Sequence, residues 1–274
     1  MAHYLVFAKP DMKSIKEIYE KIMRNEISGI KPFGKAMNHS LRLARIIDEN
    51  TVAWEEEDYC NPPLAQERAY VLDKYFEILK IEKVKEREGW NRIASKFPFW
   101  FACFGLPNRE GERPITSFRM PHQQLNQNPS LEIYKMLSNL IFSLPYVVES
   151  ESLVSVPGAR AAWIKDDAVN ARKELMWGGL EFAHIHPPYD GSLHLVLPKQ
   201  WENEVLNKGW GEPHPVYEKK LIDLPFYMIY SPRTLDEVYI VFNIFLMSYS
   251  YVLGERIWKP AELINSKLLE NSKL

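Results

Sequence analysis

The most informative segment of the chain, residues 181 to 197, reads Glu181-Phe182-Ala183-His184-Ile185-His186-Pro187-Pro188-Tyr189-Asp190-Gly191-Ser192-Leu193-His194-Leu195-Val196-Leu197. Two apolar-rich runs flank Pro187–Gly191, which is a five-residue loop of turn-forming residues. This pattern predicts a β-hairpin. If the loop closes symmetrically, His184 lies opposite His194, and His186 lies opposite Ser192.

The predicted hairpin has two different faces, because side chains alternate across a strand. One face carries Phe182, His184, His186, Ser192, His194 and Val196. The other carries Ala183, Ile185, Leu193 and Leu195, and should face a core. Three imidazoles would then converge on one small ligand, metal ion or water. A slip of one residue in the pairing would move His194 to the wrong side.

Composition predicts a soluble globular protein. The 274 residues are 46% hydrophobic and 26% charged, enough for one large domain or two smaller ones. The net charge of −2 comes without a strong basic block, which argues against a nucleic-acid binder. Cys60 and Cys103 lie far apart and suggest neither a disulfide framework nor a metal site, so we expect a cytoplasmic protein.

Membrane and nucleotide signals are weak. The first ten residues look like a strand and not a signal peptide. The most apolar runs, Phe97–Leu106 and Val238–Leu253, are shorter than the roughly 20 residues that span a bilayer. The GxGxxG, GxxxxGK[ST] and GxSxG patterns do not occur, so nucleotide binding and α/β-hydrolase chemistry lose their usual support.

The first 88 residues predict a small α+β unit. Strands are expected at residues 4–8, 51–54 and 81–84, with helices after Ser14 and after Pro62-Pro63. This order is of ferredoxin-like type. The acidic run Glu55–Asp58 is expected to be a solvated loop whose charges raise the pKa of the Cys60 thiol. The charged stretch at residues 82–89 is the predicted domain boundary.

The histidine set permits two chemistries, which the sequence leaves open. In the first, His184, His186 and His194 bind a divalent metal such as iron, zinc or manganese, with open positions for oxygen or water. In the second, no metal is needed: one histidine removes a proton from an acidic organic substrate, and others stabilise the resulting oxyanion. His214 would be an additional base or ligand.

The same histidines also have a structural interpretation, a hydrogen-bonded polar network. Two on one strand face and a third opposed to them favour a functional site. Glu181 and Asp190 are carboxylates within reach, although a regular strand would point Glu181 to the other face. Gly178, followed after five residues by His184-Ile185-His186, resembles the start of a cupin metal motif, but Asp190 stands where that motif has glutamate.

Several spaced segments form a more specific pattern. They are Arg109-Glu110-Gly111-Glu112-Arg113-Pro114-Ile115-Thr116-Ser117, Ala183-His184-Ile185-His186 with Asp190, Leu193-His194-Leu195, Lys208-Gly209-Trp210-Gly211 with His214-Pro215, and Tyr230-Ser231-Pro232-Arg233 with Glu237. Over about residues 105–254, this pattern resembles the luciferase family of bioluminescent fungi. Members of that family oxidise 3-hydroxyhispidin, a phenolic pyrone, with molecular oxygen and without a known organic cofactor.

The resemblance implies an oxygen-dependent enzyme, an oxygenase acting on a small phenolic or enolisable compound. His184, His186, His194 and His214 would be catalytic. Arg113 would pair with an anionic substrate group, and Tyr189, Asp190 and Trp210 would contact the substrate. The alternative is a non-catalytic module that binds a metal or a small molecule. Molecular oxygen is the expected co-substrate, no nucleic-acid or membrane partner is expected, and the oligomeric state stays open.

The expected architecture is α+β. A ferredoxin-like unit at residues 1–88 would pack on a luciferase-like α+β domain at residues 89–254, which has a mixed or antiparallel sheet. In this domain, a capping box at Thr234–Glu237 predicts a long buried helix over residues 235–253, ending before Gly254. Residues 255–274 would form a C-terminal tail.

Overall fold

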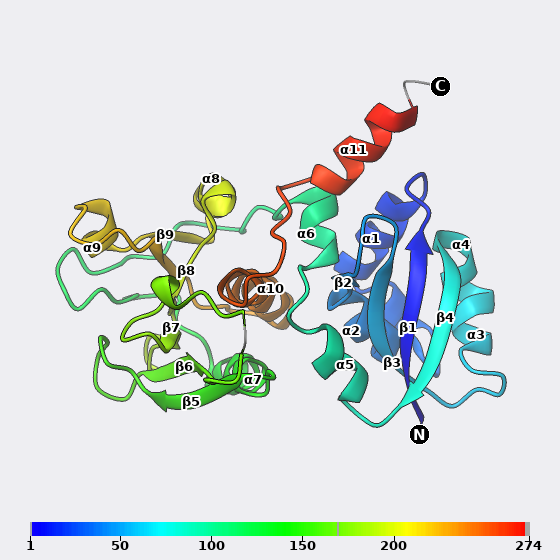
Figure 1. Cartoon of the computed structure of the whole chain (residues 1–274), viewed down its shortest axis with the longest axis horizontal. Helices are drawn as coiled ribbons and strands as arrows, with labels where there is room; N and C mark the ends of the chain where they lie inside the picture. The colour runs from blue at the N-terminus through cyan, green and yellow to red at the C-terminus, as the bar shows by residue number, and fades with distance from the viewer. Residues whose placement is uncertain (1, 169, 272–274) are drawn as a thin grey trace. The chain divides into compact units, whose positions relative to one another are not determined.

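A computed structural model describes residues 2–168 and 170–271, and these form two compact units. The first unit runs to Phe104 and includes the segment from Ala261 onward, whereas the second comprises Gly105–Pro260 (Figure 1). The division after Phe104 lies later than the boundary expected at residue 88. The expected tail contains a helix, α11 (Glu262–Asn271), while residues 272–274 lie outside the described residues.

The first unit has a four-stranded antiparallel sheet in the order β2-β3-β1-β4. Its strands are β1 (Ala2–Pro10), β2 (Arg45–Ile46), β3 (Val52–Asp58) and β4 (Phe76–Val84). Between them the chain forms α1 (Ile15–Met23), η1 (Ile27–Gly29) and α2 (Gly34–Arg42), and later α3 (Ala65–Glu67), the π-turn η2 (Arg68–Leu72) and α4 (Asp73–Tyr75). This is the predicted ferredoxin-like order, with β1 between β3 and β4.

Two details of the first unit differ from the sequence-based expectation. The last strand begins at Phe76, not at residue 81, because the preceding helical segment ends with α4. The acidic run Glu55–Asp58 is part of β3 and not a solvated loop, since Ala2–Leu5 of β1 pairs with it. Glu56 and Asp58 are consequently buried.

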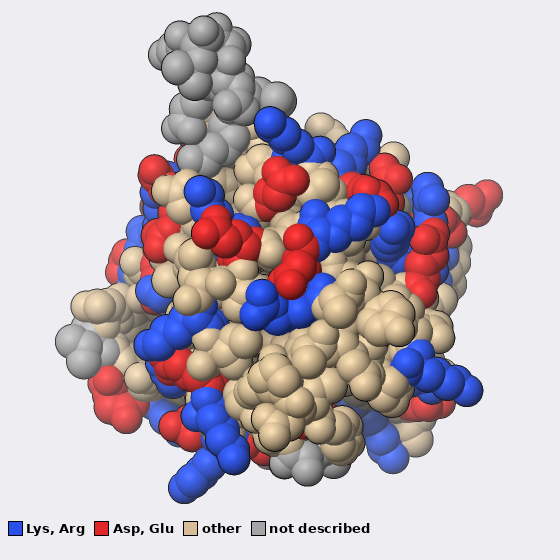
Figure 2. Space-filling model, turned by 90° about the vertical axis from the view of Figure 1, so that its right-hand side faces the viewer, with Lys and Arg blue, Asp and Glu red and all other residues tan. Residues whose placement is uncertain are grey.

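Three further helices complete this unit: α5 (Glu88–Ile93), α6 (Phe99–Phe104) and α11. The aromatic run at residues 97–101 belongs to its core, because all five residues are buried. The indole N–H of Trp100 donates to the Leu41 carbonyl over 2.6 Å. On the face shown in Figure 2, positive and negative side chains are interspersed, and neither sign forms a continuous area.

The second unit has a six-stranded antiparallel sheet in the order β5-β6-β7-β8-β10-β9. Its strands are β5 (Val147–Glu151), β6 (Arg160–Ile164), β7 (Glu181–Ile185), β8 (Leu193–Val196), β9 (Gly211–Pro213) and β10 (Phe226–Ile229). The helices are α7 (Leu131–Phe142), η3 (Lys173–Leu175), η4 (Lys199–Trp201), α8 (Glu202–Asn207), α9 (Pro215–Glu218) and α10 (Leu235–Val252). The α+β class is confirmed, with the antiparallel form of the second sheet.

Helix α10 confirms the predicted buried helix. The Thr234 hydroxyl accepts a hydrogen bond from the Glu237 amide at its start, and Gly254 follows its end with φ of +73°. Most of its residues are buried, and it packs against α7. Among the helices that the structure describes, none is both long and apolar enough to cross a membrane.

Candidate functional site

The hairpin of β7 and β8 has the predicted register. His184 pairs with His194, and Ile185 pairs with Leu193. The pairing continues into the turn, because the His186 amide donates to the Ser192 carbonyl over 2.9 Å. The predicted convergence of His184, His186 and His194 is confirmed, since one nitrogen from each ring lies within 4.8 Å of the others. All three side chains are buried.

Strand β7 carries one irregularity that the sequence does not reveal. Ala162 of β6 pairs with Ala183, whereas the next residue, Trp163, pairs with Glu181, so Phe182 is an extra residue in β7. The ring of Phe182 packs against Phe245 and Tyr249 of α10, with centroids 5.4 Å and 6.3 Å away. The expectation that Phe182 shares the histidine face is therefore wrong. The bulge instead brings Glu181 to that face.

Glu181, His184 and His194 form a chain of hydrogen bonds. Oε1 of Glu181 lies 2.9 Å from Nδ1 of His184, and Nε2 of His184 lies 3.0 Å from Nδ1 of His194. The Glu181 carboxylate also accepts from the Ser152 hydroxyl and the Leu153 amide. Because an ionised carboxylate can only accept hydrogen bonds, we assign the proton of His184 to Nδ1, which donates to Glu181. Nε2 of His184 then accepts a hydrogen bond from Nδ1 of His194.

His186 is oriented by a carboxylate of its own. Its Nδ1 lies 2.5 Å from Oδ2 of Asp190. The other Asp190 oxygen accepts from the amide of Ser192 over 3.0 Å and from its hydroxyl over 2.6 Å. Asp190 is thus a fully buried positioning group in the turn, held by bonds within the hairpin.

Two further histidines join the cluster from outside the hairpin. His214 follows β9, and its ring centroid lies 4.8 Å from that of His194. His122, which sequence analysis missed, stacks on His194 with centroids 5.4 Å apart. The cluster therefore contains every histidine of the chain except His3 and His39. His122 lies in an irregular segment with no periodicity; its one sequence signal is its position shortly after the luciferase-like segment 109–117.

A second carboxylate, Glu212, holds His122. Oε1 of Glu212 lies 2.6 Å from Nε2 of His122, and its Oε2 accepts from the Tyr230 hydroxyl over 2.9 Å. Arg113 forms an ion pair with Glu212 and donates to the Tyr230 hydroxyl over 2.6 Å. The positive charge of Arg113, predicted to bind an anionic substrate group, is thus already compensated within the protein.

The segment that carries His122 is tied to the end of β10. The Gln124 amide group donates to the Ser231 hydroxyl over 2.8 Å and accepts from the Ser231 amide over 2.9 Å. Gln124 and Ser231 are both buried, so this pair of bonds is shielded from water. The segment therefore covers the histidine cluster in a fixed position.

The electrostatics of the site favour neutral imidazoles. Burial and the neighbouring imidazoles lower the pKa of His194 well below its ordinary value, and they lower the pKa of His214 to about 3. Burial also lowers the pKa of His184, since it outweighs the bond to Glu181. Burial opposes ionisation of Glu181, but the hydrogen bonds from His184, Leu153 and Ser152 hold its pKa below the ordinary value.

The remaining predicted substrate contacts lie elsewhere. Tyr189 is 60% exposed, and its hydroxyl lies 3.5 Å from the Gln123 amide nitrogen. Trp210 is buried, and its indole N–H donates to the Pro107 carbonyl over 2.7 Å, which is a structural contact. The histidines predicted from the sequence thus come together, whereas Tyr189 and Trp210 do not line the cluster.

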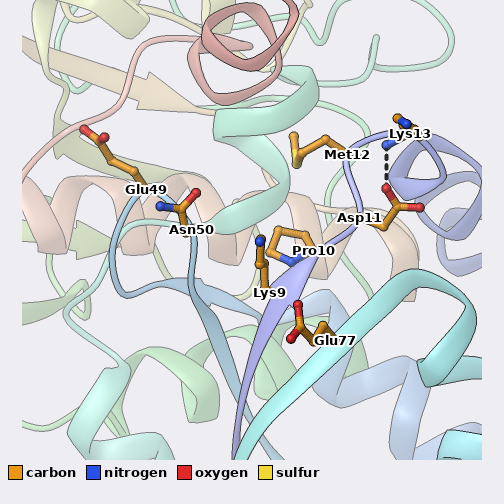
Figure 3. Close-up of a pocket in the computed structure, with 8 residues that line it drawn as sticks. All are labelled: Lys9, Pro10, Asp11, Met12, Lys13, Glu49, Asn50 and Glu77. Carbon is orange, nitrogen blue, oxygen red and sulfur yellow. Dashed lines mark hydrogen bonds between the residues drawn. The ribbon is translucent and has the colours of Figure 1, made fainter. Parts of the chain in front are cut away.

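Two of the cavities in the described part of the chain have polar linings. One of about 220 Å³ in the second unit is lined by residues that include Arg109, Arg113 and Tyr230, and no imidazole lines it. The other, of about 500 Å³, lies in the first unit at the end of β1 (Figure 3). Lys9 and Lys13 line it together with Asp11, Glu49 and Glu77, so it presents both charges and no imidazole. The smaller cavity is linked to the cluster only indirectly, because its lining residue Tyr230 is hydrogen-bonded to Glu212, which holds His122.

Within the described residues, two overlapping sets of histidines have the spacing of a metal site. They are His184, His186 and His194, as predicted, and His122, His194 and His214. A third group in the first unit contains Asp58, Cys60 and Glu67. There the carboxylate of Asp58 accepts from the amides of Tyr59, Cys60 and Leu64, which identifies it as a turn cap. As expected, the pKa of the Cys60 thiol is raised, by burial first and then by Asp58 and Glu67.

The chain is similar to fungal luciferases over part of its length. Residues 179–248, which include the hairpin and most of α10, match the model of the Luciferase domain family. A luciferase of Armillaria mellea is 29% identical over 172 residues, and one of Armillaria gallica is 30% identical over 172 residues. In both cases the match covers 55% of this chain and 62% of the relative. A luciferase of Neonothopanus nambi is 36% identical over 95 residues, 34% of this chain and 33% of the relative.

No solved structure matches the chain. The matched region spans less than two thirds of the length of each of these relatives. The range matched by the family model, residues 179–248, contains the histidines of the hairpin and His214 but not the segment at residues 109–117. The chain is therefore similar to the Luciferase domain family over these residues and to fungal luciferases over about half of its length, in agreement with the resemblance seen in its motifs.

Proposed function

We propose that this protein is an oxygen-dependent enzyme, an oxygenase that acts on a small phenolic or enolisable compound such as a pyrone. The observation that carries the proposal is the buried imidazole chain Glu181–His184–His194. A neutral imidazole offers a lone pair that can accept a proton, and the bonds through His184 to Glu181 stabilise the positive charge that results. Phenols and enols become reactive toward oxygen when they lose that proton.

The proton has a defined path in this arrangement. Nε2 of His194 is buried and carries no proton when Nδ1 donates to His184. When Nε2 accepts a proton from substrate, the Nδ1 proton of His194 moves toward Nε2 of His184. As His184 gains positive charge, the hydrogen bond from its Nδ1 to the Glu181 carboxylate becomes stronger. The positive charge is thus shared along the chain and ends beside an anion.

The cavity of about 220 Å³ fits a small anionic or phenolic substrate group. Arg109, which lines it, donates to the neutral oxygens of the Glu112 carbonyl and the Gln127 side chain. Its charge is therefore better suited than that of Arg113 to bind a substrate anion. Tyr230, another lining residue, connects the cavity to His122 through Glu212.

A divalent metal such as iron, zinc or manganese stays an alternative to the metal-free reaction, and of these three imidazole nitrogens suit iron and zinc best. A metal bound by histidines would activate oxygen or water and polarise the substrate oxygen. If Nε2 of His194 binds that metal, it is no longer the proton acceptor, and the substrate would lose its proton because the metal polarises its oxygen.

The test is oxygen uptake by the purified protein with a panel of pyrones, phenols and catechols. We expect uptake with at least one enolisable compound, and a loss of about 100-fold in turnover for His194→Asn. His3→Asn, outside the cluster, is the matched control. Replacing Arg109 by Gln should raise KM for an anionic substrate more than it lowers kcat. Tight binding of such compounds without oxygen uptake would favour the non-catalytic binding module instead.

A further inference from the structure

Two buried ring nitrogens in the cluster have no hydrogen-bond partner. They are Nδ1 of His122 and Nε2 of His194. Both side chains are 3% exposed, and the two rings are stacked with an interplanar angle of 17°. Polar atoms so deeply buried are normally paired, and an unpaired one requires an explanation such as an ion. Because both nitrogens are buried and unpaired on stacked rings, they point to a ligand that the two histidines share.

The hydrogen bonds on the other side of each ring leave both atoms with an unshared lone pair. Nε2 of His122 donates its proton to the Glu212 carboxylate, so Nδ1 of His122 carries no proton. Nδ1 of His194 donates its proton to Nε2 of His184, so Nε2 of His194 carries no proton. Histidines that bind metals commonly donate their other N–H to a carboxylate or another acceptor, and this fixes the tautomer. Both histidines show this arrangement.

His214 supplies the third ligand. Its ring centroid lies 5.1 Å from that of His122 and 4.8 Å from that of His194, with interplanar angles of 79° and 83°. One nitrogen of each ring lies within 4.8 Å of the others, and tetrahedral ligands about 2.0 Å from an ion would approach to roughly 3.3 Å. Nδ1 of His214 accepts a 3.3 Å hydrogen bond from the Val216 amide, and coordination through Nε2 would keep that bond.

The other histidine set is less suited to an ion. His184 and His194 bond to each other through Nε2 and Nδ1, so one of these two nitrogens carries a proton and is not a ligand. Binding a metal through Nε2 of His184 would break its bond to His194 and so separate His194 from Glu181. At the His122 set, in contrast, binding through the two unpaired nitrogens leaves the bond between His184 and His194 in place.

We propose that His122, His194 and His214 bind one divalent transition-metal ion, with Glu212 and His184 as positioning residues. Three neutral imidazoles leave coordination positions open on the ion, and imidazole is a ligand for zinc, iron, copper and nickel. This inference deepens the proposed function: a role of the ion in catalysis rests on that function, whereas the binding of the ion does not. Binding itself is testable without a substrate.

Cobalt(II) is the probe, because its visible bands report coordination by histidine. The full chain is first treated with a chelator and then titrated with Co²⁺. We expect one equivalent to bind and to raise the melting temperature. His122→Asn and His214→Asn should each weaken binding at least about 100-fold, and Glu212→Gln about 10–100-fold. His186→Asn, the matched control from the other set, should bind Co²⁺ within about threefold of the unsubstituted protein.

Three outcomes would overturn the proposal. The first is no stoichiometric binding by the unsubstituted protein. The second is loss of binding in His186→Asn with retention in His122→Asn, which would assign the ion to the hairpin set. The third is unchanged binding in Glu212→Gln, which answers the question even if His122→Asn does not fold. Oxygen uptake by protein that binds no Co²⁺ would overturn this inference and leave the proposed enzyme intact, whereas Co²⁺ binding without oxygen uptake would support this inference and count against the proposed enzyme.

Discussion

Glu181 and His184 are hydrogen-bonded over 2.9 Å, although regular alternation along a strand would place them on opposite faces. The extra residue Phe182 accounts for this geometry, because it shifts the pairing of β7 with β6 by one position. A carboxylate thereby lies behind the imidazole. The bulge is thus part of the site and gives the first prediction.

Replacing Glu181 by Gln should lower turnover about 10–100-fold while the protein stays folded, because the carboxylate positions His184 and stabilises its charge. Loss of that charge also lowers the pKa of His184 further, since Glu181 raises it at present. The acid limb of the turnover profile should therefore move to lower pH. Glu149→Gln, on the exposed ion pair with Arg160, is the control. Equal losses in both variants would argue against a positioning role.

Replacing His184 or His194 by Ala should cut turnover about 100-fold or more if, as proposed, the two hydrogen-bonded rings accept the substrate proton. A purely structural network predicts the reverse: a loss of roughly 1–3 kcal/mol in the free energy of unfolding and normal turnover per folded molecule. Thermal unfolding and oxygen uptake, measured on the same samples, separate the two. His3→Ala should leave both quantities near their original values.

Stability should fall as the pH decreases from about 6.5. His214 has a folded-state pKa of about 3, below its value in the unfolded chain. Between these values the unfolded chain binds more protons, so the free energy of unfolding rises with pH. Each such histidine adds a slope of up to about 1.4 kcal/mol per pH unit. His214→Asn should show a shallower slope between pH 5 and 6.5 than His3→Asn; equal slopes would contradict this.

Glu56 should have the opposite pH dependence. It is fully buried in β3, its Oε2 accepts from the Trp54 indole over 3.1 Å, and its Oε1 has no partner. Burial first, and then Glu67, raises its pKa well above the ordinary value. Above pH 4.5 Glu56 ionises in the unfolded chain but stays protonated in the folded protein, so the free energy of unfolding falls as the pH rises.

Glu56→Gln should remove that cost and keep the acceptor for Trp54. We expect the free energy of unfolding to increase by at least about 1 kcal/mol at pH 8 and to change little at pH 5. Denaturant unfolding at the two pH values measures the difference. Glu57→Gln, on the other face of the strand, serves as the control, and a gain of the same size there would contradict the argument.

The hairpin, the convergence of its histidines and α10 could be predicted from the sequence because local patterns determine them. A period of two fixes the face of His184 and His194, and a five-residue turn fixes their register. A capping threonine and Gly254 bound α10. These signals need no knowledge of distant contacts.

The rest depends on contacts that no local pattern encodes. His122 lies in an irregular segment, and only the tertiary bonds of Gln124 to Ser231 place it over His194. The role of Arg113 changed for the same reason, since its partner Glu212 is far away in the sequence. The burial of Glu56 follows from the pairing of β1 with β3, which the acidic run alone does not suggest.

Phe182 links the aromatic packing of α10 to the hydrogen bond behind the imidazole of His184. Its ring lies against Phe245 and Tyr249, while the residue before it is Glu181. A change of ring size at Phe245 would move the backbone of the bulge, and with it the carboxylate that orients His184. Substitutions in α10 would therefore alter the orientation of His184 without replacing any residue of the histidine cluster.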